Sequence, residues 1–180
     1  MTFIISSVDS VKYGFDITNE KLDNKLTNIS SFAKETIVEL RDTIWAMNSN
    51  EISFEDLEGR IHNFIEKAKE AKDDITFSFE IDKNLATKKL SSVEGMNVYR
   101  TIQEAINNSL KYAKASHIKI EAVKEANQTK ITVSDDGIGF NEAEINYGNG
   151  LNNMKKRIKE IGGELHIFSS ENGTTIEVLI

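Results

Sequence analysis

A long repeat of apolar residues near the start of the chain limits its possible folds more than any other feature. The apolar positions recur at steps of four and three that nearly alternate, which is a heptad seam. They are Leu22, Leu26, Ile29, Ala33, Ile37, Leu40, Ile44 and Met47. A helix of this length extends roughly 40 Å at 1.5 Å per residue, too far for a small domain to cover. We therefore expect it to pair with other helices.

Apolar residues closer to the start have the same spacing, at Ile4, Val8, Val11 and Phe15. They predict a second helix, and hence a helical hairpin in residues 1–50. The absence of proline from all 180 residues suits long helices. An ordinary amphipathic hairpin, packed on the chain's own domain, is the alternative interpretation.

The composition excludes several classes of function. A formal net charge of −7 argues against a broad surface for nucleic acid or for anionic membranes. The chain has no cysteine, so disulfides, thiolate metal sites and cysteine nucleophiles are excluded. No stretch resembles a signal peptide or a membrane span, which needs roughly 20 apolar residues. We expect a cytoplasmic protein.

Residues 51–180 predict a second domain in which helices and strands are mixed. Two capping-box patterns, Ser53 to Asp56 and Ser91 to Glu94, each open a helix. Periodicity and turn residues predict helices over 53–72, 92–113 and 151–161, and strands over 75–81, 117–123, 129–134, 164–169 and 174–180. Adjacent strands joined by short turns favour antiparallel pairing. The expected fold class is α+β: a two-layer α/β sandwich with a mixed, largely antiparallel sheet, preceded by the helical hairpin.

The predicted helix over 92–113 has one polar side that suits a metal-bound polyphosphate. At about 100° per residue, Glu104, Asn108, Lys111 and Tyr112 lie opposite the apolar face. An amide or carboxylate oxygen can occupy one site on Mg²⁺, while a lysine offsets phosphate charge. Glu104 can also serve as a general base. Taken alone, this side is more simply interpreted as a solvated polar face.

Glycines and polar residues follow two of the predicted strands. Asp135 stands at the end of a strand, where its carboxylate can accept a hydrogen bond from an amino group, and Gly137 and Gly139 allow backbone to approach a base ring closely. A plain Asp-Gly turn is the alternative. Gly148 and Gly150 precede the helix that begins at Leu151, whose free N–H groups favour phosphate.

Two further segments complete the candidate site. The polar stretch 141–149 predicts either a mobile lid over a nucleotide or a simple surface loop. Thr174 belongs to an Asn-Gly-Thr-Thr segment, which is either a hairpin turn or a hydroxyl-bearing turn near the same cleft.

The order of these motifs is more specific than any one of them. A Glu-x-x-x-Asn helix, Asp-x-Gly-x-Gly, Gly-x-Gly-Leu and Gly-Thr follow one another within residues 91–180. This order resembles the nucleotide-binding (Bergerat-type) fold of gyrase, Hsp90, histidine kinases and the MutL ATPases. The segment 103–113 looks like the N box, and 148–157 like the last glycine box, of the nitrate-sensor-like class of two-component histidine kinases.

The resemblance implies a role for each motif in binding Mg-ATP. Asn108 would hold Mg²⁺, Asp135 would bond the adenine amino group, and Glu104 would activate the nucleophile. The other ATP-binding residues would be Lys111, Tyr112, Gly137, Gly139, Gly148, Gly150, Leu151 and Thr174. A single Gly-x-Gly, with no phenylalanine-centred box between Phe140 and Gly148, is similar to the short-lidded class.

The front of the chain extends the resemblance to the dimerisation helices of these kinases. Residues 39–47 look like the end of the second such helix, and residues 2–7 like the stretch that follows the phosphoacceptor motif, which is itself absent. His62, His117 and His166 do not replace it, so we expect structural or surface roles for them. We thus expect a partial dimerisation hairpin in 1–50 and an ATP-binding catalytic domain in 51–180.

The resemblance also implies partners and a reaction. This chain would bind ATP without phosphorylating itself, form a homodimer through residues 1–50, and serve the receiver domain of a response regulator. Any membrane attachment would come through missing parts of the parent protein, and no nucleic acid is expected. Two alternatives stay open: a non-catalytic ATP-binding dimerisation or interaction module, and a serine kinase of the anti-sigma-factor type, against which the heptad hairpin argues.

Overall fold

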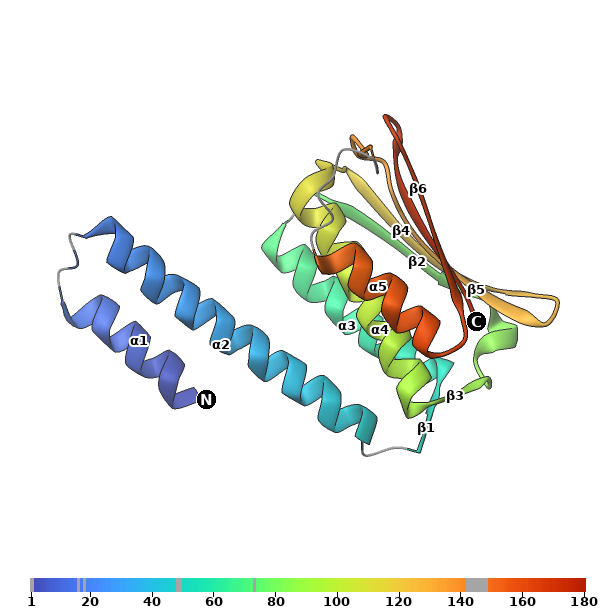
Figure 1. Ribbon diagram of the computed structural model, residues 1–180, viewed down its shortest axis with the longest axis horizontal. Coiled ribbons are helices and arrows are strands. Elements are labelled where there is room, and N and C mark those ends of the chain that lie inside the picture. Colours follow the sequence, from blue (N-terminus) through green and yellow to red (C-terminus); the bar gives the residue numbers. More distant parts are fainter. Residues whose placement is uncertain (1, 16, 18, 48–49, 73, 142–148) are drawn as a thin grey trace. The chain divides into compact units, whose positions relative to one another are not determined.

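The computed structural model describes residues 2–15, 17, 19–47, 50–72, 74–141 and 149–180 (Figure 1). The chain divides into two compact units, Met1–Asn48 and Ser49–Ile180. The first unit contains the helices α1 (Thr2–Gly14) and α2 (Glu20–Met47), which pack on each other as the predicted hairpin. Near the turn, Lys12 Nζ lies 2.9 Å from Asp23 Oδ1 and donates to Thr27 Oγ1 at 2.6 Å.

The second unit is built on a five-stranded sheet in the order β2-β4-β5-β7-β6. The strands are β2 (Thr76–Ile81), β4 (His117–Glu125), β5 (Gln128–Asp135), β6 (Glu164–Ser170) and β7 (Gly173–Leu179). Strand β2 pairs with β4 in parallel and the other pairs are antiparallel, so the sheet is mixed and largely antiparallel, as predicted.

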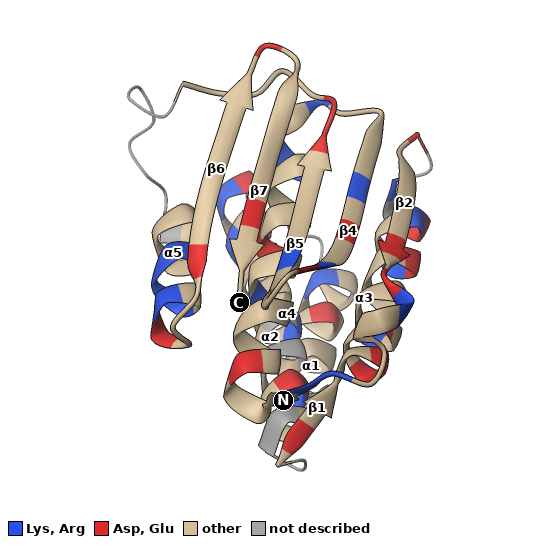
Figure 2. Cartoon of the chain, turned by 90° about the vertical axis from the view of Figure 1, so that its right-hand side faces the viewer, with Lys and Arg blue, Asp and Glu red and all other residues tan. Residues whose placement is uncertain are grey.

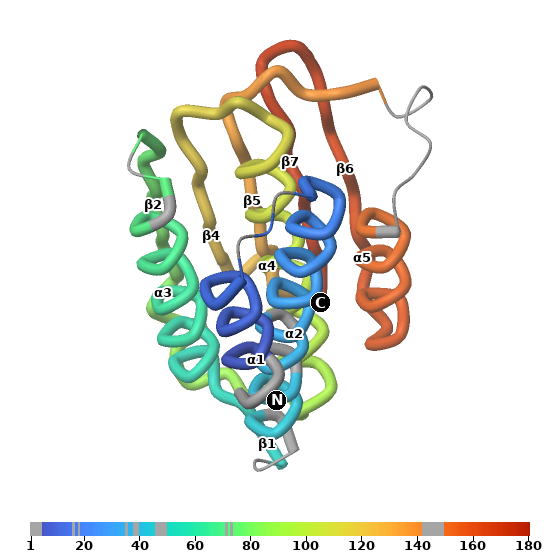
Figure 3. The backbone as a smooth tube through the Cα atoms, turned by 90° about the vertical axis from the view of Figure 1, so that its left-hand side faces the viewer, coloured from blue at the N-terminus to red at the C-terminus, as the bar shows by residue number. Residues whose placement is uncertain are grey.

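Three helices cover one face of this sheet: α3 (Phe54–Ala71), α4 (Ser92–Asn108) and α5 (Asn149–Glu160). Figures 2 and 3 show the sheet and these helices from opposite sides. Alternate strand residues point into the core, where Ile118, Ile120, Val133 and Ile176 meet apolar side chains of the helices. Their neighbours on the strands are more polar, as the Lys119–Glu121 ion pair at 3.2 Å shows. The α+β sandwich predicted from the sequence is confirmed.

Both predicted capping boxes are present and fix where α3 and α4 begin. Ser53 Oγ accepts from the Asp56 N–H at 3.1 Å, and Asp56 Oδ2 accepts from the Ser53 N–H at 3.1 Å. Ser91 and Glu94 exchange the same pair of bonds. Helix α5 is followed by two glycines that end it: Gly162 has a φ of +75°, and the Gly163 N–H donates to Ile158 O at 3.0 Å.

The structure also differs from the predicted elements. A short two-stranded sheet of β1 (Glu51–Ser53) and β3 (Lys89–Ser91) and a 3-10 turn, Lys83–Leu85, were not predicted. The helix predicted to run evenly to residue 113 is α-helical only to Asn108 and continues as a π-helix over Ser109–Ala113. Apolar periodicity cannot distinguish these two helix types over a single turn. Across the described residues, the helices all fall short of the length and apolarity that a bilayer span needs.

Candidate functional site

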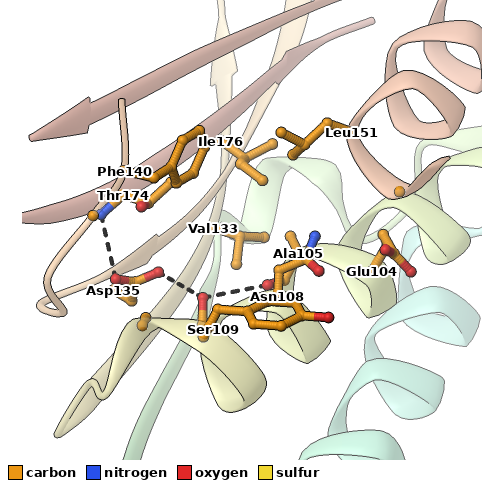
Figure 4. A pocket seen from close by; sticks show the side chains of 14 residues that line it. Glu104, Ala105, Asn108, Ser109, Val133, Asp135, Phe140, Leu151, Thr174 and Ile176 are labelled. Atoms are coloured by element: carbon orange, nitrogen blue, oxygen red, sulfur yellow. Dashed lines mark hydrogen bonds between the residues drawn. The ribbon is translucent and has the colours of Figure 1, made fainter. Parts of the chain in front are cut away.

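A pocket of about 450 Å³ opens between α4, the π-helix, strands β5 and β7, and the first turn of α5 (Figure 4). This volume lies within the ordinary range for small-molecule sites. Its lining residues are Glu104, Ala105, Asn108, Ser109, Tyr112, Ala113, Val133, Asp135, Gly139, Phe140, Gly150, Leu151, Thr174 and Ile176. In Figure 4, Asp135 and Glu104 lie toward opposite ends of the pocket, with Asn108 between them.

The pocket brings together most of the residues singled out in the sequence. The predicted residues that line it are Glu104, Asn108, Tyr112, Asp135, Gly139, Gly150, Leu151 and Thr174. Lys111 is exposed and does not line the pocket, and Gly137 is buried against Ala113. Gly148 and nearly all of the predicted lid, 141–149, fall outside the described residues.

Asp135 is held rigidly at the end of β5 by three hydrogen bonds. Its Oδ1 accepts from the backbone N–H of Gly137 at 3.0 Å and of Thr174 at 3.3 Å. Its Oδ2 accepts from the Ser109 hydroxyl at 2.6 Å, a short distance typical of a hydroxyl bound to a carboxylate. These bonds orient the carboxylate toward the pocket.

The π-helix continues α4 and is hydrogen-bonded to the loop that follows Asp135. The last carbonyls of a helix have no donor within the helix, and here other parts of the unit supply donors. Lys72 Nζ donates to Leu110 O at 2.5 Å, and the Ile138 N–H donates to Ala113 O at 2.8 Å. The end of the helix and the Asp-Gly loop are therefore fixed to each other, beside the pocket.

Glu104 and the first turn of α5 are in close contact at the other end of the pocket. A Cβ placed on Gly150 would lie 2.2 Å from Glu104 Oε1, so the absence of a side chain lets the helix approach the carboxylate. Glu104 and Asn108 are both half-buried. Both side chains line the pocket, and Glu104 lies at the end where α5 begins.

The charge of the pocket is negative. Glu104 and Asp135 contribute two carboxylates, and no lysine or arginine is found among the described residues that line it. The described residues also contain no group of three or more histidine, cysteine, aspartate or glutamate side chains that could hold a metal.

Sequence reasoning missed the apolar walls and one hydroxyl. Ala105, Val133, Phe140 and Ile176 line the pocket, and no motif in the sequence singled them out as binding residues. Phe140 is tied in place because its N–H donates to Ser169 Oγ at 2.8 Å. Ser109 was missed because no local pattern links it to Asp135, which lies 26 positions further on.

The neighbouring acid, Asp136, has a structural role outside the pocket. Its carboxylate accepts from the Ser116 hydroxyl at 2.6 Å and from the N–H groups of Ser116 and His117, both at 2.8 Å. The bond from the Ser116 hydroxyl, followed by that from the His117 N–H, holds the pKa of Asp136 below its ordinary value. These bonds fix the start of β4 to the Asp-Gly loop.

We expect Asp136→Asn to lower the free energy of unfolding at neutral pH by about 1 kcal/mol, a modest loss because Asp136 is exposed to water. A lowered folded-state pKa stabilises the fold above the unfolded value of about 3.9, and this contribution disappears as pH falls through the folded value. Urea unfolding between about pH 7 and about pH 3 should show the variant and the wild type converging at the acid end. A difference independent of pH would contradict this account.

Comparisons with known proteins agree with this geometry. Residues 94–180 match the family described as histidine kinase-, DNA gyrase B- and HSP90-like ATPase. The chain is 27% identical over 186 residues to the sensor histidine kinase YxjM of Bacillus subtilis, an alignment that covers 99% of this chain and 43% of that protein. Residues 94–180 form an ATP-binding domain of the histidine kinase type. This ATP-binding domain contains the whole described pocket.

A second curated relative and a solved structure are also similar to this chain, the structure in its fold. The histidine-protein kinase/phosphatase DegS of Brevibacillus brevis is 36% identical over 85 residues, 46% of this chain and 22% of that protein. The histidine kinase domain of the blue-light activated kinase of Erythrobacter litoralis EL346 superposes with a TM-score of 0.65 at 18% identity, covering 100% of this chain and 95% of that one. The chain spans less than half the length of these two curated relatives.

Proposed function

We propose that this chain is the catalytic ATP-binding region of a two-component sensor histidine kinase. It would bind Mg-ATP and transfer the γ-phosphoryl group to a histidine outside residues 1–180, from which an aspartate of a response regulator receives it. The observation that carries the proposal is the pocket itself. An oriented Asp135 lies at one end of it, Glu104 lies at the other, and Asn108 lies between them.

The end of the pocket around Asp135 suits adenine. Its carboxylate accepts hydrogen bonds, as an exocyclic amino group requires, while Val133, Ile176 and Phe140 supply apolar surface for the ring. Gly139 and Thr174 line the same part. In this proposal Asp135 bonds the amino group, and Thr174 acts both through its backbone bond to Asp135 and as part of the wall.

The opposite end suits phosphates that carry a divalent cation. Because the described lining has no lysine or arginine, a triphosphate beside Glu104 needs its charge offset by Mg²⁺. The Asn108 amide oxygen is a suitable ligand, and phosphates and water would complete the coordination, as Mg²⁺ prefers. We keep Lys111, Tyr112, Gly148, Gly150 and Leu151 as proposed ATP contacts, although the structure places Lys111 outside the pocket lining.

Glu104 is the proposed general base. A neutral imidazole nitrogen would attack the γ-phosphorus, the bond to the β,γ-bridging oxygen would break, and ADP would leave. The imidazole then loses its proton, and the Glu104 carboxylate would accept it. None of this chain's histidines is proposed as the acceptor. His117 is bonded to Thr76 and Ser78, and His166 lies 3.4 Å from Glu164 on β6.

Residues 1–50 form the proposed dimerisation hairpin, and residues 51–180 the catalytic domain. Heptad residues of α2, including Leu22, Ile29, Leu40 and Ile44, are about half exposed in the single chain. Burying such a stripe against a second copy would gain apolar contact area. We place the chain in the cytoplasm, with a receiver domain as its partner and membrane attachment, if any, through other parts of the protein.

Calorimetric titration with a non-hydrolysable ATP analogue, with and without Mg²⁺, tests the binding step. We expect binding that depends on Mg²⁺, and no incorporation of labelled phosphate into this chain alone. Absence of binding at high concentration would favour a non-catalytic interaction module. Acid-labile, base-stable phosphate on this exact chain would contradict the placement of the acceptor elsewhere.

Asp135→Asn should raise the dissociation constant for ATP by about 10- to 30-fold, because a charge-assisted hydrogen bond to the base is lost. The asparagine Oδ1 can still accept from Gly137 and Thr174, so the loop should keep its shape. Asp136→Asn is the matched control: it changes the adjacent acid, which bonds Ser116 away from the pocket, and should leave ATP affinity unchanged. Equal losses in both variants would point to loop distortion rather than base recognition.

A further inference from the structure

We infer that Ser109 is a positioning residue that makes the pocket selective for a purine with an amino group at position 6. The inference rests on the proposed ATP-binding function and adds a specificity device to it. Ser109 begins the π-helix, is 6% exposed, and lines the pocket beside Asp135 (Figure 4).

The Ser109 hydroxyl has one proton and two candidate acceptors. Asp135 Oδ2 lies 2.6 Å away and Ala105 O lies 3.2 Å away. The shorter distance and the charge of the carboxylate both favour donation to Asp135. Because Ser109 is buried, water competes little for this bond. The hydroxyl therefore fixes the rotation of the Asp135 carboxylate about its side-chain bonds.

The bond from Ser109 leaves one acceptor site of the Asp135 carboxylate for a ligand. A carboxylate offers about four lone-pair sites. The N–H groups of Gly137 and Thr174 occupy both sites of Oδ1, and Ser109 occupies one site of Oδ2. Among the described residues, one site on Oδ2 is left for a ligand. Asp135 thus presents one fixed acceptor, which matches a single N–H of an amino group.

A fixed acceptor also rejects the wrong base. Adenine places an amino group at position 6, whereas hypoxanthine and guanine place a carbonyl oxygen there. A carbonyl oxygen facing the remaining lone pair of Oδ2 would be repelled and left without a donor. Without Ser109, Oδ2 would have two open sites and a freer rotation, so water could enter and the rejection would weaken.

The test compares ATP with inosine triphosphate, which carries the carbonyl, by calorimetric titration with Mg²⁺. In Ser109→Ala we expect the dissociation constant for ATP to rise about 5-fold, with that for inosine triphosphate nearly unchanged, so that selectivity falls by about the same factor. Ser109→Cys, which keeps the volume filled but donates weakly, should shift selectivity in the same direction.

Thr101→Val is the matched control. Thr101 likewise has a buried hydroxyl, but it lies on α4, is bonded to Asn97 O at 2.8 Å and does not line the pocket, so its loss should leave selectivity unchanged. Unchanged selectivity in both Ser109 variants, or an equal weakening of both nucleotides, would overturn this inference alone. If the wild type bound neither nucleotide, the proposed function would fail, and this inference with it.

Discussion

Glu104→Gln is expected to slow phosphoryl transfer about 100-fold while changing ATP affinity less than about threefold, because an amide fills the same space but cannot accept a proton. Glu104 lines the pocket at the end opposite Asp135 and packs against Gly150, so the amide keeps the contact with α5. Removing a negative charge beside the triphosphate should, if anything, favour binding. The measurement is labelled-phosphate transfer in a kinase whose acceptor-bearing segment is present, with ATP affinity measured in parallel.

Glu58→Gln gives the matched control for this experiment. Glu58 is an exposed carboxylate on α3 outside the pocket lining, so the same chemical change there should leave both transfer and affinity unaltered. Full transfer activity in Glu104→Gln would assign the proton acceptor to another group. A loss of ATP affinity as large as the loss of transfer would make Glu104 a binding residue instead.

The features of the fold that could be predicted are those that local chemistry dictates. The boxes at Ser53 and Ser91 satisfy orphan N–H groups within three residues of themselves, so the helix starts follow from the sequence. Buried and more exposed residues alternate along β4 and β5 because successive side chains of a strand point to opposite faces of the sheet. Gly162 ends α5 because its φ is positive.

The features that were missed depend on contacts distant in sequence or on small changes of helical phase. Each residue of a π-helix turns through a smaller angle about the helix axis than a residue of an α-helix. The polar face that was predicted from an α-helical period therefore shifts after Asn108, and Lys111 does not line the pocket. The bond from Ser109 to Asp135 exists only after the π-helix and β5 pack together. Asn108 precedes the π-helix and lines the pocket as predicted, because the regular phase holds that far.

Gly173→Ala is expected to lower the free energy of unfolding of the ATP-binding unit by about 3 kcal/mol or more, because the change adds backbone strain and overlap with rigid backbone. Gly173 is buried and has a φ of +123°, a region that side-chain-bearing residues avoid. A Cβ there would lie 1.9 Å from Asp135 O. This carbonyl cannot move freely, because Asp135 is opposite Thr174 in the β5–β7 ladder. Urea unfolding followed by hydrogen exchange of β5 and β7 measures the effect.

Gly162→Ala separates the two contributions to that loss. Gly162 has a φ of +75°, but a Cβ there would have no neighbour within 4 Å, so only the backbone cost of about 1 kcal/mol should remain. Equal losses in the two variants would mean that the β6–β7 hairpin shifts to accept the methyl group. The predicted difference has a functional consequence as well. Because the carbonyl that Gly173 approaches belongs to Asp135, the steric change should weaken ATP binding in the molecules that remain folded, whereas Gly162→Ala, at the far end of α5, should not.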